Sequence, residues 1–466
     1  MAAGGKQLIS ALSNLSIQYN FACITIALAF MDNTSSDSKA VPPAYPRTDI
    51  QSALLKSLVF AGAITGQLTM GYAGDALGRR WAMLLTNCFS IVGALSTALL
   101  TWGSNIYIIM GIGRFLLGVG VGGKYPLAAT MSQESEQGGE NRSLEVAKGF
   151  FWQSPGAMLP YAVGMLLLTV FGHEKHGANY LLATSIQFRL LLGIGAVPTI
   201  ITTVLTYHSK ESAEYEEARA ANSMGTNPLR IAWAHPELWG RLAGCGISWF
   251  LYDFVFYGTS FNQVDITDRV FGNGNSLWNN CWQNVVLSAV GVPGVASAVS
   301  LLMCWSSRKL QIAGFAATVL GCGLLALAVW LNASITVKFL LFCLLLFVLN
   351  WGINVSTYTL PAECFPTNVR STFFGLSAAM GKVGALIGSA TFAWITDEVG
   401  LDGVYLVCAA GSFVGVLITL ALIPDKTFSA RIVERIPRGN GSEHGTSLNQ
   451  PALLDSTGKA SRESLL

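Results

Sequence analysis

The sequence predicts an all-α membrane protein with about twelve spanning helices arranged as two six-helix bundles. The first observation is composition: 12% of the 466 residues are charged, about half the roughly 25% usual in soluble domains, and 52% are hydrophobic. A soluble chain of this length could not bury so much apolar surface, whereas the hydrocarbon core of a bilayer accepts it. The second is the recurrence of apolar runs of about 20 residues between short polar loops, the length needed to cross that core.

The apolar runs give the order of the expected helices. We expect spanning helices at roughly 9–31, 51–73, 81–101, 105–130, 147–171, 187–207, 241–262, 283–304, 311–331, 337–360, 372–396 and 403–424. The longest internal polar stretch contains KESAEYEEARAANS and lies between the sixth and seventh runs. The predicted units are therefore an N-terminal bundle at 1–207, a cytoplasmic linker at 208–240, a C-terminal bundle at 241–426 and a disordered cytoplasmic tail at 427–466.

Basic residues favour the inner side of a membrane and so predict the orientation. With the N-terminus inside, the inner segments carry Arg79, Arg80, Arg142, Lys148, Lys210, Arg219, Arg230, Arg241, Arg308, Lys309, Arg370, Lys426, Arg431, Arg435 and Arg438. The opposite side carries Lys39, Arg47, Lys175, Arg189, Arg269 and Lys338. We therefore expect both termini in the cytoplasm, and the plasma membrane as the location, with a vacuolar or other internal membrane as the alternative.

The segment after the second expected helix reads GYAGDALGRR, from Gly71 to Arg80. It resembles the G-x-x-x-D-x-x-G-R-[KR] loop of the major facilitator superfamily, and this resemblance implies that fold. Gly71 and Gly78 permit tight turns and close helix approach. Asp75 can accept hydrogen bonds from a neighbouring helix or pair with an arginine, and Arg79 and Arg80 can anchor the loop at the inner surface.

Two further segments carry the resemblance to this superfamily. The fourth expected helix contains Arg114 followed by Gly118, Gly120, Gly122 and Gly123. The tenth ends in PAECFPTNVR, which is similar to an ending shared with sugar porters. Within this segment, Glu363 and Arg370 are expected to form an inner-surface gate or brace. The full set of expected gating residues is Gly71, Asp75, Gly78, Arg79, Arg80, Arg114, Glu363 and Arg370.

The seventh expected helix narrows the resemblance. WFLYDFVFYG places Trp249, Asp253 and Tyr257 on one helix face, and a carboxylate inside an apolar span is costly unless it faces a cavity. Phosphate:proton symporters carry the same Trp-x-x-x-Asp-x-x-x-Tyr pattern facing bound phosphate. GGKYPLAATMSQE, around Tyr125, also resembles their signature GG-D-YPLSAT-x-x-SE. A structural ion pair remains the alternative for Asp253, and a packing stripe the alternative for the aromatic residues.

Three more positions complete the candidate site. The resemblance implies substrate contacts for Gln153 on the fifth helix and Asn354 on the tenth. Lys382 lies between glycines on the eleventh helix, where a buried lysine needs an anion or a carboxylate. The expected substrate-binding residues are Tyr125, Gln153, Trp249, Asp253, Tyr257, Asn354 and Lys382.

The chain departs from the symporter pattern at three acidic positions. The family has a D-x-Y-D arrangement in the first helix, where this chain has Ile17 and Asn20, and Lys124 stands where the fourth helix has an aspartate. A cavity that is more positive by about three charges favours anions. We therefore expect a Lys124–Asp253 pair that an incoming anion breaks, which would give uniport or anion exchange with weak proton linkage.

The combined interpretation is a transporter that moves inorganic phosphate, or a related small anion, by alternating access, with or without proton coupling. A sugar, polyol or organic-anion porter and a non-transporting membrane nutrient receptor are the alternatives. The sequence has no Ser/His pair, HExxH motif or aspartate dyad at membrane depth, so an enzyme is not expected. We expect no cofactor, metal or nucleic-acid partner, and the family resemblance implies a functional monomer.

Overall fold

The computed structural model describes residues 3–32, 45–134, 142–172, 180–220, 228–261 and 276–424. The tail expected at 427–466 lies outside these residues. The N-terminal helices are α1 (Ala3–Asp32), α2 (Asp49–Leu77), α3 (Arg79–Leu99), α4 (Ile106–Gln133), α5 (Arg142–Phe151), α6 (Gln153–Phe171), α7 (Tyr180–Ile194) and α8 (Val197–Tyr207), with a short 3₁₀ turn at Gly103–Asn105. The linker helices are α9 (Ala213–Ala220) and α10 (Pro228–Ala234). The C-terminal helices are α11 (Pro236–Phe261), α13 (Leu277–Leu301), α14 (Ser307–Trp330), α15 (Ile335–Asn350), α16 (Ile353–Cys364) and α17 (Arg370–Leu422).

Several spans are broken helices. Within the described residues, 11 helical segments are long and apolar enough to cross a membrane. The pairs α5–α6, α7–α8 and α15–α16 each form one such segment, whereas α17 contains two, with Gly400 at φ 74° near the bend. The 26-residue α11 is not among the 11 because its sequence is more polar, and it is the helix that carries Asp253. It packs along α17 and completes the second bundle, so the all-α fold predicted from the sequence is confirmed.

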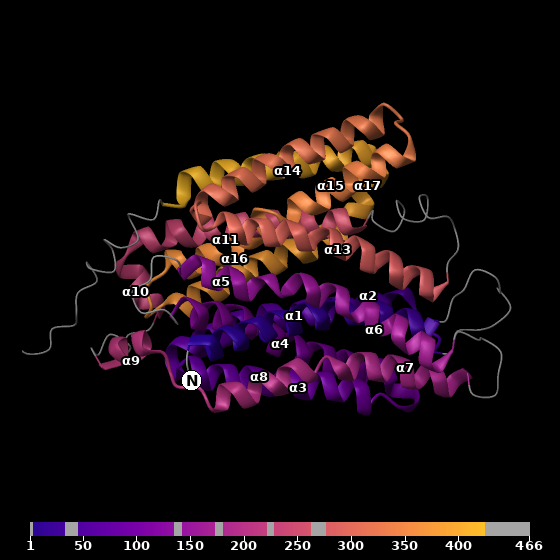
Figure 1. Cartoon of the computed structure of the whole chain (residues 1–466), viewed down its shortest axis with the longest axis horizontal. Helices are drawn as coiled ribbons and strands as arrows, with labels where there is room; N and C mark the ends of the chain where they lie inside the picture. The colour runs from indigo at the N-terminus through magenta and orange to yellow at the C-terminus, as the bar shows by residue number, and fades with distance from the viewer. Residues whose placement is uncertain are drawn as a thin grey trace, which may run out of the picture.

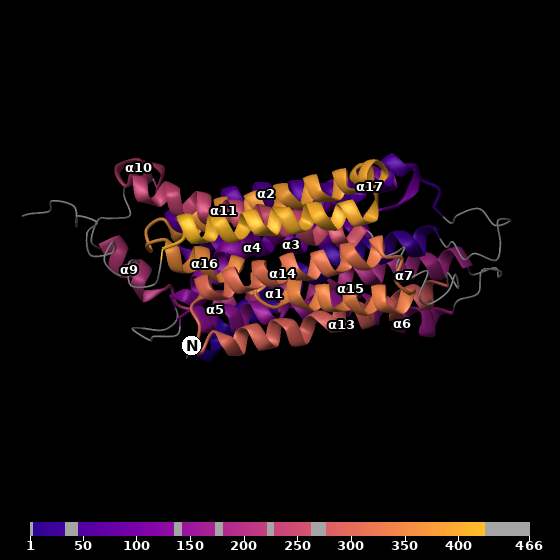
Figure 2. The same cartoon turned by 90° about the horizontal axis from the view of Figure 1, so that it is seen from above.

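The helices run along the long axis of the molecule in two groups. In Figure 1 the N-terminal helices fill the lower part and most of the C-terminal helices the upper part. Both views place α9, α10, the start of α1 and the end of α17 at the same end of the molecule (Figures 1 and 2). We call this end the linker end.

Close helix packing depends on glycine at the contact between α11 and α17. A Cβ atom at Gly384 would overlap the carbonyl oxygen of Phe250, and one at Gly381 would overlap the ring of Trp249. Small residues allow this approach in a membrane, where the gain comes from van der Waals contact rather than from the exclusion of water. The two glycines therefore bring α11 and α17 close enough for their polar side chains to meet.

Gly384→Ala should destabilise the protein by about 1–3 kcal/mol, because the added methyl group overlaps backbone that cannot move aside. The measurement is thermal unfolding in detergent. Gly323→Ala on α14 is the matched control, since a Cβ atom there meets nothing within 4 Å. Equal unfolding temperatures for the two variants would contradict the assignment of Gly384 to this contact.

Candidate functional site

A buried ion pair lies at the centre of the contact between α11 and α17. Nζ of Lys382 donates to Oδ2 of Asp253 at 2.8 Å, and the two side chains are 3% and 4% exposed. A charge that is removed from water needs a partner of opposite charge, and here each residue supplies the other's partner. The structure thus pairs Asp253 with Lys382 rather than with Lys124, which corrects the pairing expected from the sequence.

Aromatic rings from both groups of helices surround this pair. Nζ of Lys382 lies 5.4 Å from the ring centroid of Tyr125, 5.3 Å from that of Tyr257 and 5.6 Å from that of Phe21. Ring faces attract a cation at these distances. Because Phe21 belongs to α1 and Tyr125 to α4, the ammonium group is held between the N-terminal and the C-terminal helices.

Trp249 forms an aromatic layer beside the pair. Its ring centroid lies 6.2 Å from that of Tyr125, 6.4 Å from that of Tyr358 and 5.7 Å from that of Phe374. Trp249 and Tyr125 are both buried. The structure therefore brings together four predicted residues of the seventh and eleventh helices, Trp249, Asp253, Tyr257 and Lys382, with Tyr125 of the fourth.

A chain of amide groups crosses from α1 to α16. Gln18 Nε2 donates to Gln153 Oε1 at 2.8 Å, and Gln153 Nε2 donates to Asn14 Oδ1 at 2.8 Å. Asn14 Nδ2 in turn donates to the hydroxyl of Tyr358 at 3.4 Å. Sequence reasoning selected Gln153 and missed Asn14, Gln18 and Tyr358. The spacing of Asn14, Gln18 and Phe21 on one face of α1 is the signal that could have found the first two.

Asn354 has a more local environment than the other predicted residues. Its Nδ2 donates to Oδ1 of Asn350 at 3.1 Å, one turn earlier in the chain. No hydrogen bond or ion pair in the described part of the chain joins it to Gln153 or to Lys382. We define the central site as Tyr125, Gln153, Trp249, Asp253, Tyr257 and Lys382, and Asn354 stays a prediction.

Lys124 lies among hydroxyl groups inside the N-terminal helices. Its Nζ donates to Ser16 Oγ at 3.0 Å and to Thr199 Oγ1 at 2.7 Å, and the side chain is fully buried. These partners belong to α1 and α8, and the described residues place no carboxylate within ion-pair distance of it. Ser16 lies on the face of α1 opposite to the face that carries Gln18 and Phe21. Lys124 therefore ties α1, α4 and α8 together, and it does not contact the central site.

A second cluster of charges joins the two groups of helices at the linker end. Arg79 Nη2 lies 2.9 Å from Glu134 Oε1, and Arg370 Nη1 lies 3.0 Å from the same oxygen. Asp75 accepts hydrogen bonds from the backbone N–H groups of Ser371 and Thr372 at 3.3 and 2.8 Å, so it caps the N-terminus of α17. We call Asp75, Arg79, Glu134 and Arg370 the linker-end gate.

The charge of Glu134 is stabilised by the two guanidinium groups. Burial alone would raise the pKa of this carboxyl group, but Arg79 and Arg370 outweigh burial and hold the pKa below its ordinary value. Glu134 therefore stays ionised over the physiological pH range.

The linker contributes to the same gate. The ring of Tyr215 on α9 lies 4.6 Å from Cζ of Arg79, and Glu211 Oε2 accepts from the backbone N–H of Arg80 at 3.1 Å. Glu214 Oε2 lies 3.3 Å from Nη1 of Arg370. The segment between the two groups of helices thus contacts residues from both of them.

The other expected gating residues have different positions. Arg114 lies inside α4 and donates from Nη2 to the carbonyl oxygen of Asn20 at 3.0 Å, so it is not part of a loop or of the linker-end gate. Glu363 accepts a hydrogen bond from Ser307 of α14, which makes it a contact within the C-terminal helices. Of the ten-residue motif, only Gly78, at φ 104°, lies between two helices.

The opposite end of the molecule is closed by apolar contact. A buried cluster there contains Ile26 and Phe30 of α1, Leu167 of α6 and Cys281 of α13. A Cβ atom at Gly164 of α6 would lie 3.2 Å from Sγ of Cys281. Among the residues that the structure describes, the two groups of helices therefore meet through charged contacts at the linker end and through apolar contacts at the other.

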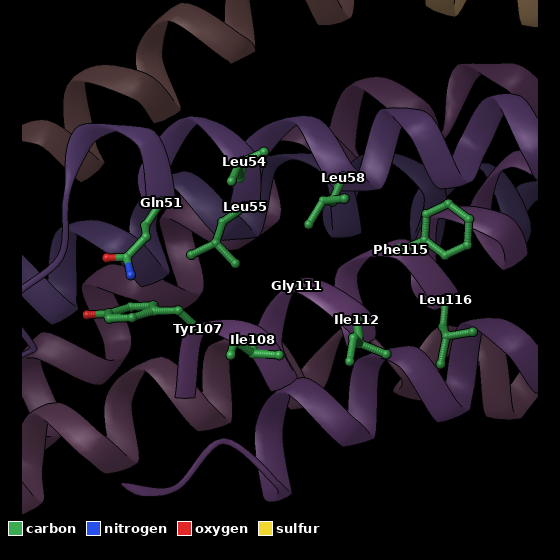
Figure 3. Close-up of a pocket in the computed structure, with 10 residues that line it drawn as sticks. All are labelled: Gln51, Leu54, Leu55, Leu58, Tyr107, Ile108, Gly111, Ile112, Phe115 and Leu116. Atoms are coloured by element: carbon green, nitrogen blue, oxygen red, sulfur yellow. The ribbon is translucent and has the colours of Figure 1, made fainter. Parts of the chain in front are cut away.

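A separate hollow lies on the flank of the N-terminal helices. It has a volume of about 460 Å³ and is lined by residues of α2 and α4, among them Gln51, Leu58, Tyr107 and Phe115 (Figure 3). The two polar groups have partners of their own, because Gln51 Oε1 accepts from Thr48 N and Tyr107 donates to Tyr45 O. It contains no residue of the central site, and its apolar lining suits lipid rather than an anion.

Comparison with known proteins identifies the family. The model of the family described as sugar (and other) transporter matches residues 6–229 and 245–430. The chain belongs to the sugar (and other) transporter family. As a member of this family it is a multi-pass membrane transporter and not an enzyme.

Relatives in this family include two proteins named as phosphate transporters. Inorganic phosphate transporter PT2 of Toxoplasma gondii is 34% identical over 423 residues, which cover 89% of this chain and 72% of the relative. Probable inorganic phosphate transporter 1-6 of Arabidopsis thaliana is 28% identical over 429 residues, which cover 80% of this chain and 81% of the relative.

Solved structures of two symporters share the fold. The major facilitator proton:xylose symporter XylE, bound to 6-bromo-6-deoxy-D-glucose, matches with a TM-score of 0.74 at 16% identity, over 91% of this chain and 96% of that one. The major facilitator transporter FucP in its outward conformation matches with a TM-score of 0.66 at 15% identity, over 89% and 97%. This sugar (and other) transporter family member therefore has the major facilitator fold, as the resemblance implied.

Proposed function

We propose that this protein transports inorganic phosphate and that the central site binds it. The observation that carries the proposal is the buried Lys382–Asp253 pair between the two groups of helices. Phosphate oxygens can accept from the ammonium of Lys382, while a P–OH group of dihydrogen phosphate can donate to the carboxylate of Asp253. One anion can then contact both charged groups, with its negative charge attracted by Lys382. The names of the two relatives support the same substrate.

The remaining residues of the site suit an oxyanion. The amide of Gln153 and the hydroxyl groups of Tyr125 and Tyr257 would supply further donors, and the ring of Trp249 would limit the size of the ligand. Asn354, whose amide donates to Asn350 in this structure, would join them after a local rearrangement.

Transport would proceed by alternating access of the central site. The moving units would be the bundles 1–207 and 241–426, which separate in turn at the linker end and at the opposite end. The linker, 208–240, would remain in contact with both. The positive-inside rule supports a cytoplasmic position for the linker end and for both termini. We propose the plasma membrane as the location and a monomer as the functional unit.

We also propose that a proton gradient drives this transport only weakly. Ile17 and Asn20 carry no titratable group, and Lys124 is held by Ser16 and Thr199. Asp253 is then the one carboxylate of the central site, and its charge is already matched by Lys382. Such a site favours uniport or anion exchange over proton symport.

The test is exchange of labelled phosphate in proteoliposomes, with and without an imposed pH gradient at clamped membrane potential. We expect phosphate exchange that hexoses do not inhibit and that a protonophore leaves largely intact. Competition by hexoses would favour a sugar porter, and binding without exchange would favour a receptor. Phosphate accumulation that a protonophore abolishes would overturn the proposal of weak proton linkage and leave Asp253 as the proton carrier.

A further inference from the structure

Gln67 of α2 is a buried amide without a partner. The side chain is fully buried, and neither Oε1 nor Nε2 has a hydrogen-bond partner among the residues that the structure describes. A buried amide that forms no hydrogen bond is destabilising, and native structures pair almost all such groups. A second state of the protein in which Gln67 has a partner would account for its presence.

The position of Gln67 indicates what that state is. The backbone carbonyl oxygen of Gln67 occupies the space that a Cβ atom at Gly375 would take, so this residue lies where α2 meets α17. One turn further along α2, a Cβ atom at Gly71 would lie 2.6 Å from the carbonyl oxygen of Ser371. This interface joins an N-terminal helix to a C-terminal one, so opening of the linker end in the proposed alternating access would separate it.

Along α17, the contact with Gln67 falls between the central site and the linker-end gate. Lys382 follows Gly375 by about two helical turns, roughly 10 Å along the axis. Thr372 precedes Gly375 by about one turn, and its backbone N–H donates a hydrogen bond to Asp75 of the linker-end gate. An anion that leaves Lys382 for the linker end therefore passes the level of Gln67.

Asn87 provides a contrast within the same protein. Its two amide atoms are also buried and unpaired among the described residues. However, it lies on α3, which packs against α2, α4, α7 and α8, all of them N-terminal helices. Opening of the linker end would expose Gln67 and leave Asn87 buried.

We propose that Gln67 is a second contact for the transported anion, reached after Lys382 on the way to the linker end. The proposal rests on the proposed phosphate transport and names a further residue of its path. The amide N–H₂ donates to a phosphate oxygen, and the amide carbonyl accepts from a P–OH group. Because the amide is neutral, it holds the anion more weakly than Lys382 does and lets it move on.

The first test compares the apparent KM for phosphate on the two sides of oriented proteoliposomes. In Gln67→Met, which keeps the length of the side chain and removes its polarity, we expect the KM at the linker side to rise about tenfold. The KM at the opposite side should stay within about twofold, and Asn87→Leu, the control, should change neither. A purely structural role predicts a different result, because removal of an unpaired amide stabilises the closed interface and moves the two KM values in opposite directions.

The second test reports contact directly. Gln67→Cys, in a background where the exposed Cys88 and Cys304 are replaced by Ser, is treated with a membrane-impermeant thiol reagent. We expect modification from the linker side only, and slower modification in the presence of phosphate. Modification that phosphate does not slow, in a preparation that exchanges phosphate, would overturn the inference. A wild-type protein that exchanges no phosphate would instead refute the proposed substrate, while the sidedness of labelling would still decide whether position 67 lines the path.

Discussion

Asp253→Asn should reduce phosphate exchange by about two orders of magnitude or more, because loss of one member of a buried ion pair costs about 3–5 kcal/mol. The ammonium of Lys382 would then lie between aromatic rings without a counter-charge, and the carboxylate that receives the P–OH group would be gone. Lys382→Met should have a similar effect, since it leaves the carboxylate unpaired and removes the cation that attracts the anion. Both variants are measured as exchange rates in proteoliposomes at equal protein content.

The double variant, Asp253→Asn with Lys382→Met, separates binding from folding. It removes both charges, so its unfolding temperature should recover toward that of the wild type while exchange stays absent. A double variant that exchanges phosphate at the wild-type rate would mean that the pair is structural only. Gly323→Ala on α14 is the control, because the added Cβ atom meets nothing within 4 Å, and its exchange rate should equal that of the wild type.

Glu134→Gln should release the linker-end gate, because one carboxylate there contacts both Arg79 and Arg370. Without it, Arg79 and Arg370 keep their longer ion pairs with Asp75 and Glu214, and the loss of a buried partner costs up to about 3–5 kcal/mol. We expect a lower unfolding temperature and faster thiol labelling of Gln67→Cys from the linker side. Glu145→Gln, which disrupts only the exposed pair with Lys148, is the control and should change neither quantity.

The lowered pKa of Glu134 determines the contribution of this one carboxyl group to the pH dependence of the gate. A carboxyl group whose pKa is depressed in the folded protein stabilises it fully above the ordinary pKa, and this contribution is lost only as the pH falls through the lowered value. With Glu134 intact, the labelling rate of Gln67→Cys, corrected for the fraction of thiolate at each pH, should therefore show no change due to Glu134 between about pH 5 and 8. A labelling rate that changes with a midpoint near neutral pH and disappears in Glu134→Gln would contradict this assignment.

Much of the fold could be predicted from the sequence, because a membrane span has a fixed length and a distinct composition. The breaks within spans, such as the one between α15 and α16 at Trp351, could not, because hydropathy does not record backbone geometry. The helix of Asp253 satisfies the hydropathy pattern least well, since the same polar residues that indicate a site lower its apolar character.

Single residues of the candidate site could be predicted from the sequence, but which of them contact each other could not. The sequence indicates Asp253 and Lys382 separately, each because a charge at membrane depth needs a partner. Their contact depends on how α11 packs against α17, which neither local pattern specifies. The sequence therefore favours Lys124 as the partner of Asp253, and this prediction is wrong. Asn14, Gln18 and Tyr358 were missed because neutral polar residues are common in helices and become informative only through their neighbours.

The contrast between the two ends of the molecule has a consequence for how each half of the cycle responds to its surroundings. Opening the linker end would separate Glu134 from Arg370, a step that dissolved ions assist because they screen the separated charges. Opening the other end exposes the cluster of Phe30, Leu167 and Cys281, a step that carries a positive heat-capacity change. Ionic strength therefore acts mainly on the opening of the linker end, and temperature acts mainly on the opening of the other end, whose free energy depends on temperature in a curved way. The slowest step of transport can then differ between a cold medium of low salt and a warm medium of high salt.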